Sequence, residues 1–182
     1  MNYLWTCDSQ ILIYNKMKKN YCVRINIVLQ GKLPLKERDE MNGNVELLDY
    51  IYQNSQMGVK TLSRLRKITQ DEEFKHYLNN QYLEYLDIHQ KAKYILNKNG
   101  YKEIGITTWE KMRTCIMIKL NTLMDKSTSH IAEMLIIGSN MGIIDGVKNI
   151  KKYKNAKMGI LQLMNKLVQT EENNVQQLKR FL

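Results

Sequence analysis

Hydrophobic residues between positions 44 and 69 recur in alternating steps of three and four, the spacing of one packed face of an α-helix. The members of this face are Leu48, Ile51, Ser55, Gly58, Leu62 and Leu65. Two of them, Ser55 and Gly58, are small. Glycine inside a helix costs about 1 kcal/mol relative to alanine, so Gly58 indicates that a neighbouring helix packs closely against this face.

A second helix is predicted over residues 71–100. Its first turn is acidic, which complements the helix dipole, and Gly100 suits the C-terminal cap. We expect Glu84 on the same side as an inner face that comprises Phe74, Tyr77 or Leu78, Gln81, Tyr85, Ile88, Ala92 and Ile95. The connection to the first helix is very short, so the two helices should be antiparallel neighbours.

A third helix is predicted over residues 107–125, where Thr107 and Glu110 form a capping box. One of its sides carries Trp109, Met112, Ile116, Leu120 and Leu123. At 1.5 Å per residue this helix would be roughly 25–28 Å long, enough to cross a helical bundle. Because it would lie outside the core, it is also the surface that we expect to form a homodimer.

Two further helices are predicted over residues 129–153 and 156–182. The former is apolar on nearly every side between Ile131 and Ile150, which is typical of a central helix. It also carries small residues suited to close helix packing, namely Gly138, Ser139, Gly142 and Gly146. The latter has one apolar face with a single glutamate in it: Leu161, Met164, Val168, Glu171, Val175, Leu178 and Leu182.

Two short stretches nearly repeat, Ser-Gln-Met-Gly at residues 55–58 and Ser-Asn-Met-Gly at residues 139–142. Aligning them places the first helix on the fourth and brings Glu84 opposite Glu171. The chain is therefore predicted to be all-α, an antiparallel bundle of two related hairpins joined by a crossover helix. Each hairpin would offer one glutamate to the middle of the bundle.

This arrangement resembles the ferritin-like superfamily, and more closely an uncharacterised bacterial branch with a similar Met-Gly stretch in its first helix. The resemblance covers residues 41–182. It implies a four-helix bundle that often holds two iron or manganese ions through a glutamate from each first helix and a Glu-x-x-His from each second helix. Here the second-helix motifs read Glu84-x-x-Asp87 and Glu171-x-x-Asn174, without histidine, and the first-helix positions are the amides Gln56 and Asn140.

The departures from that pattern leave Glu84, Asp87 and Glu171 as an incomplete candidate site for iron or manganese. A di-metal site needs several carboxylates and usually imidazole. Gln56, Asn140 and Asn174 are then expected to be polar partners in the core. The alternative is that the two glutamates simply hydrogen-bond to these amides or to tyrosines, because buried carboxylates need partners; the nearby tyrosines are Tyr52, Tyr82 and Tyr85.

Composition limits the partners and the cellular compartment that we expect for the chain. The 182-residue chain has a formal net charge of +10, but no nucleic-acid motif accompanies it, so we expect lysines spread over solvated faces and no specific nucleic-acid binding. Its three cysteines, Cys7, Cys22 and Cys115, form no CxxC pair, which favours the reducing cytoplasm. No apolar run is long enough to span a bilayer.

Residues 1–40 differ from the remainder, since they hold Pro34, two of the cysteines and a β-branched stretch at residues 23–29 that could form a strand. Met41 directly precedes a predicted helix start at residues 42–44. One hypothesis is that Met41 is the natural start and that residues 1–40 result from a misplaced start codon. The other is a flexible arm that docks on the bundle.

Three functions stay open at this point. The first is a ferritin-like bundle with a degenerate carboxylate centre, acting as a non-catalytic cytosolic interaction or stress-associated module. The second is a di-iron or di-manganese oxidoreductase or peroxide scavenger. The third is a basic helical protein that binds nucleic acid or an anionic surface. No nucleotide-binding loop, zinc spacing or nucleophile motif supports another enzyme class, so the sequence favours the first.

Overall fold

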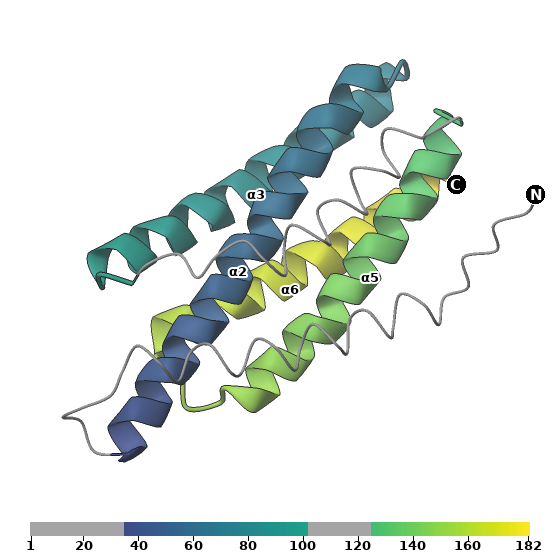
Figure 1. Cartoon of the computed structure of the whole chain (residues 1–182). Coiled ribbons are helices and arrows are strands. Elements are labelled where there is room, and N and C mark those ends of the chain that lie inside the picture. Colours follow the sequence, from purple (N-terminus) through teal and green to yellow (C-terminus); the bar gives the residue numbers. More distant parts are fainter. Residues whose placement is uncertain (1–34, 102–124) are drawn as a thin grey trace, which may run out of the picture.

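The computed structural model describes residues 35–101 and 125–182, with side chains from residue 43 onward in the first range. The described residues form four long helices, a short 3-10 turn and no strand, so the all-α prediction is confirmed (Figure 1). The elements are α2 (Leu35–Ile68), α3 (Glu72–Lys98), α5 (Thr128–Lys152), α6 (Met158–Leu178) and η1 (Lys179–Phe181). The predicted helix at residues 107–125, with its proposed dimer face, and the possible strand at residues 23–29 lie outside the described residues, apart from residue 125.

The helices pair as two hairpins. In the first hairpin α3 packs along α2, and in the second hairpin α6 packs along α5, while fewer contacts join one hairpin to the other. The helices α2 and α6 run in one direction, and α3 and α5 run in the opposite direction (Figure 1). None of the described helices is both long enough and apolar enough to cross a membrane.

The ends of the helices follow the expected capping chemistry. The Asp71 carboxylate accepts a hydrogen bond from the Phe74 backbone N–H at 2.8 Å, and Ser127 caps α5 by accepting from the His130 N–H at 3.3 Å. Gly100 follows α3 with φ of +65°, the left-handed conformation that glycine favours after a helix.

One cap is supplied across the bundle. The N-cap residue of α6, Lys157, makes no capping bond with its own side chain, and its backbone N–H instead donates to Asn44 Oδ1 at 2.6 Å. Asn44 is 6% exposed. It therefore ties the α2 end of the first hairpin to the turn of the second.

The first helix begins earlier than predicted. Residues 42–44 were expected to start it, but α2 begins at Leu35 and passes through Gly43 without a break. Leu35 follows Pro34 in the sequence, and proline favours the first turn of a helix. The helix thus runs across the predicted boundary between residues 40 and 41.

Most of the predicted inner faces are confirmed. On α2 the predicted leucines and isoleucine are fully buried, and Ser55 is buried with them. On α3 the face is as predicted except that Leu96, rather than Ile95, is fully buried at its end. The face of α6 is buried at Met164, Val168, Glu171, Val175 and Leu178.

The fourth helix, which was predicted to be central, buries few residues in the described part of the chain. Only Ile131, Ala132 and Gly146 of α5 are buried, although the helix is apolar on nearly every side between Ile131 and Ile150. Apolar composition predicts burial without indicating which side is covered. In the described part, α5 contacts chiefly α6, so much of its surface faces away from other described elements.

Close packing occurs at Gly58, Gly142 and Gly146 among the predicted small residues. A Cβ atom on Gly58 would lie 2.6 Å from the Tyr85 ring, and one on Gly146 would lie 2.5 Å from Val168. Gly138 was expected on the same ridge, but it is exposed and a Cβ atom there would meet nothing within 4 Å. The ridge is therefore limited to the half of α5 that faces α6.

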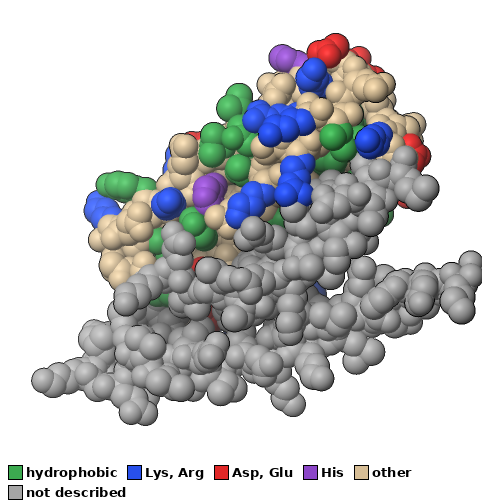
Figure 2. Space-filling view, turned by 45° about the horizontal axis from the view of Figure 1, so that its top comes forward, with side chains coloured by type: hydrophobic (Ala, Val, Ile, Leu, Met, Phe, Trp, Pro, Cys, Tyr) green, Lys and Arg blue, Asp and Glu red, His purple; other side chains and the backbone are tan. Residues whose placement is uncertain are grey.

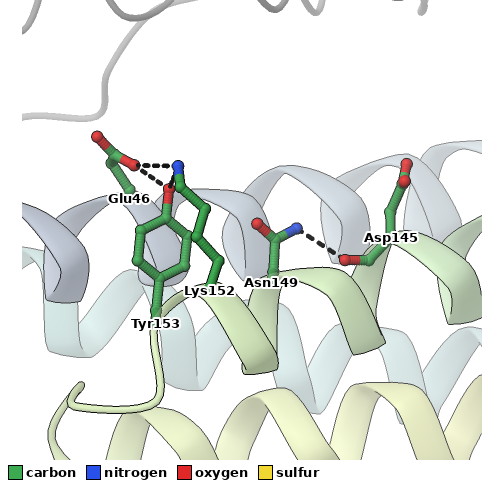
Figure 3. Close-up of polar contacts among 5 residues, drawn as sticks. All are labelled: Glu46, Asp145, Asn149, Lys152 and Tyr153. Atoms are coloured by element: carbon green, nitrogen blue, oxygen red, sulfur yellow. Dashed lines mark hydrogen bonds and ion pairs between the residues drawn. The ribbon is translucent and has the colours of Figure 1, made fainter.

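A polar contact joins the hairpins at the end of α5. Glu46 on α2 accepts hydrogen bonds from the Tyr153 hydroxyl and from Lys152 Nζ, the latter at 3.2 Å (Figure 3). The Tyr153 ring lies under Gly43, where a Cβ atom would be 3.3 Å away. One turn back on α5, Asn149 donates to the Asp145 carbonyl at 2.9 Å. The Asn149 bond lies within α5, whereas the contacts of Glu46, together with the Asn44 cap, fix the turn of the second hairpin against α2.

Candidate functional site

A buried carboxyl group lies between the two helices of the second hairpin. Glu171, on the inner face of α6, is only 3% exposed. Its carboxyl group occupies the space beside the Gly142 backbone, so that a Cβ atom on Gly142 would lie 1.9 Å from Oε2 and 2.7 Å from Oε1. Gly142 is required here because any larger residue would compete with the carboxyl group for the same space.

The pKa of this carboxyl group is raised to about 8, chiefly because burial penalises its charged form. The side chains of Tyr85 and Asn54 donate hydrogen bonds to it, which lowers the pKa, and the negative charge of Asp145 raises it further. Below about pH 8 Glu171 is therefore mostly neutral, which reduces the cost of burying it.

Tyr85 connects this carboxyl group to three helices. It lies on α3, is 7% exposed, and makes side-chain hydrogen bonds with Ser139 of α5 and with Glu171 and Asn174 of α6. Its pKa is well above the usual value of 10, because of burial first and the Glu171 charge second. The tyrosine is thus a neutral hydrogen-bonding group at any physiological pH.

The first helix contributes a second tyrosine and an amide. Asn54 Nδ2 donates to the Tyr50 hydroxyl at 3.2 Å, and that hydroxyl donates to the Gly142 carbonyl at 3.4 Å. The contact bridges α2 to the same turn of α5 that receives Glu171. All four helices therefore contribute to one polar centre, which consists of Tyr50, Asn54, Tyr85, Ser139, Gly142, Asp145, Glu171 and Asn174.

A further polar layer lies beside this centre. Tyr77 donates to the Asn174 carbonyl at 3.2 Å, and Gln81 Nε2 donates to the Tyr77 hydroxyl at 2.7 Å. Burial raises the pKa of Tyr77 to about 12, although the hydrogen bond from Gln81 lowers it. Two buried atoms, Glu171 Oε2 and Asn174 Nδ2, have no hydrogen-bond partner within the described part of the chain.

The three predicted metal ligands are not brought together. Glu84 is exposed on α3, and Asp87 is bound by Lys91 at 2.8 Å and by Lys166 at 2.6 Å. These two lysines lower the pKa of Asp87. Within residues 43–101 and 125–182, no three His, Cys, Asp or Glu side chains gather as a metal ion would require. The described residues therefore do not fit the di-metal centre that the ferritin-like resemblance implies.

The three amides that were predicted to be polar partners in the core differ in how deeply they are buried. Asn174 is buried at 1% exposure and belongs to the centre. Gln56 is half-buried, donating to the Tyr52 hydroxyl at 3.5 Å, and Asn140 is exposed. The expected pairing of these amides with the glutamates is wrong for Asn140.

Glu84 was predicted to face the middle of the bundle, but the adjacent residue Tyr85 occupies that position. Tyr85 lies against Gly58 in the first hairpin as Glu171 lies against Gly142 in the second. The structural counterpart of Glu171 is therefore Tyr85. A shift of one residue rotates a side chain by about 100° around a helix, which moves Glu84 from the inner face to the surface.

Tyr85 is among the partners that the sequence predicts for the glutamates, whereas Tyr50 and Asn54 are not. These two lie four residues apart beside the predicted apolar face of α2, a spacing that places them on one side of the helix. This spacing was the signal in the sequence by which the two residues could have been identified.

Comparisons of this chain with protein-family models, with curated proteins and with solved structures found no match.

Proposed function

We propose that this chain is a ferritin-like helical bundle whose carboxylate centre is structural, and that it acts as a non-catalytic interaction module in the cytoplasm. The observation that carries the proposal is the position of Glu171 on Gly142. The carboxyl group fills the space between α5 and α6 and receives donors from Tyr85 and Asn54, which is the arrangement of a packed core group.

The surroundings of the other two candidate ligands support the same proposal. The di-metal alternative needs Glu84 and Asp87 to turn inward, but Glu84 is exposed and Asp87 links α3 to α6 through Lys166. An inward rotation of Asp87 would break two ion pairs. The pairing of the helices as two hairpins supports the ferritin-like arrangement without deciding the crossover between them.

The surface charge weighs against the third alternative, a basic protein for nucleic acid or anionic surfaces. Lys and Arg side chains are spread between hydrophobic and uncharged side chains over the described part of one face (Figure 2). Several lysines also have acidic partners, among them Lys152 with Glu46 and Lys166 with Asp87.

Elemental analysis tests the proposal. The full chain would be expressed in medium supplemented with iron and manganese, purified without chelator, and compared with Glu171→Gln and with the surface control Glu84→Gln. A structural centre predicts the same trace metal content in all three proteins. About two equivalents of iron or manganese per chain, lost in Glu171→Gln, would contradict the proposal and favour the di-metal oxidoreductase.

A further inference from the structure

The helix α5 exposes a stripe of large hydrophobic residues. Four of the eight large hydrophobic side chains that are exposed in the described part lie on this one helix: Ile137 at 55%, Met141 at 54%, Ile144 at 54% and Val147 at 37%. The helix lies at the edge of the described bundle (Figure 1). Contiguous exposed apolar surface of this kind marks an interaction site more often than isolated exposed residues do.

The stripe has the spacing of a helix-pairing surface. Ile137, Met141 and Ile144 are separated by four and three residues, and the half-buried Met134 extends the same spacing by one more step. Alternating steps of three and four place side chains on the seam of two packed helices. Gly138 lies beside the stripe, and a Cβ atom there would meet nothing within 4 Å, so a second backbone could approach closely.

The charges that flank the stripe are opposite in sign. Glu133 is 63% exposed at the start of the stripe, and Lys148 is 65% exposed at its end. In two antiparallel copies of α5 centred between residues 140 and 141, residue 137 lies opposite residue 144, and residue 133 lies opposite residue 148. Each isoleucine then meets an isoleucine, and each glutamate meets a lysine, at both ends of the interface.

We propose that two copies of this chain associate through α5, antiparallel, about a two-fold axis near Asn140 and Met141. A two-fold interface must be self-complementary, and the stripe satisfies this requirement in the spacing of its hydrophobic side chains and in the signs of its flanking charges. The proposal rests on the proposed interaction role, for which it names a second copy as the partner. It fails separately, because a metal-free monomer would overturn this surface and leave the structural role of Glu171 intact.

Sedimentation equilibrium of the full chain under reducing conditions provides the first test. We expect a dimer for the unmodified chain, a monomer for Met141→Lys, and a dimer for the control Leu83→Lys, which places the same charge on a side chain that is 59% exposed on α3. A chain that stays monomeric at the highest attainable concentration would overturn the proposal. It would also be overturned by a dimer that Met141→Lys leaves intact.

A charge exchange tests the antiparallel register. Glu133→Lys alone and Lys148→Glu alone each place like charges together at both ends of the interface, and each should weaken the dimer about tenfold at low salt. The double variant Glu133→Lys with Lys148→Glu should restore it, because the pairs re-form with exchanged signs. Failure of the double variant to recover would contradict the two-fold arrangement, and with it the proposal. Circular dichroism would verify that each variant is folded.

Discussion

The two hairpins use the same packing device for different chemistry. In the first hairpin the aromatic ring of Tyr85 lies against Gly58, and in the second the carboxyl group of Glu171 lies against Gly142. Each glycine allows its partner helix to bring a large side chain up to the backbone. The first hairpin buries a neutral phenol, whose hydroxyl needs a hydrogen-bond partner, whereas the second buries an acid, which needs donors and a proton.

This difference extends to the helices themselves. Both helices of the first hairpin bury a continuous inner face. In the second hairpin α6 buries its face, but α5 buries only three residues. The contact between Glu171 and Gly142 places a titratable group between the two helices of the second hairpin, so we expect its stability to respond to pH as well as to packing.

The largest expected effect comes from Gly142→Ala. The added methyl group would overlap both carboxyl oxygens, so Glu171 would have to leave its site, and we expect the free energy of unfolding to fall by more than about 4 kcal/mol. The control is Gly159→Ala on α6, which lies outside the proposed interface between copies, where the added group also has open space and should not destabilise the fold. Urea unfolding followed by circular dichroism measures both. Equal effects at the two glycines would show that the contact is not tight.

A smaller effect is expected from pH. The pKa of Glu171 is about 8 in the folded protein and 4.5 when unperturbed, so between these values the folded chain holds a proton that the unfolded chain has lost. Stability is fully present below about pH 4.5 and decreases as the pH rises through 8, by on the order of 3 to 4 kcal/mol between pH 5 and 8.

The matched variant for this prediction is Glu171→Gln, which keeps the shape of the side chain and removes the titration. The difference in unfolding free energy between the two proteins should change with pH over this window and be constant below it. A difference that is the same at pH 5 and pH 8 would mean that Glu171 is not protonated in the folded protein.

The smallest of these effects is expected in the first hairpin. Gly58→Ala brings a methyl group within 2.6 Å of the Tyr85 ring, and overpacking of this kind costs about 1–3 kcal/mol. The loss should be smaller in the Tyr85→Ala background, because the ring that the methyl group meets is then absent. Urea unfolding of the four proteins measures both losses, and an equal loss in the two backgrounds would show that the contact between Gly58 and Tyr85 is not tight.

Periodicity in the sequence was enough to predict the faces of α2, α3 and α6, because a single amphipathic stripe identifies the buried side of a helix. It was not enough for α5, which is apolar all round, so that composition alone could not tell which side is covered. The repeated quartets identified Gly58 and Gly142 as contact positions. They could not fix the partner residue, since adjacent residues such as Glu84 and Tyr85 face directions about 100° apart.

Contacts between the hairpins were also beyond the sequence. The cap that Asn44 gives to Lys157 joins residues 113 positions apart, and no pattern in the sequence near either residue predicts it. Glu171 itself could be identified, because it is a single acid on an otherwise apolar face. Its neutral state follows only from the burial and the donors that the folded chain provides.

The most direct test of the central claim is the titration of Glu171 itself. The side-chain carboxyl carbon would be followed by NMR in the full chain labelled with ¹³C-glutamate, and assigned by its absence in Glu171→Gln. We predict a pKa of about 8, which should be the same in metal-free buffer and in the same buffer with added zinc, a diamagnetic divalent ion, as expected for a neutral structural group in a packed core. A pKa at or below 4.5 would contradict the account, because it would mean that Glu171 is ionised in the core and that a cation or another charge partner stabilises it there.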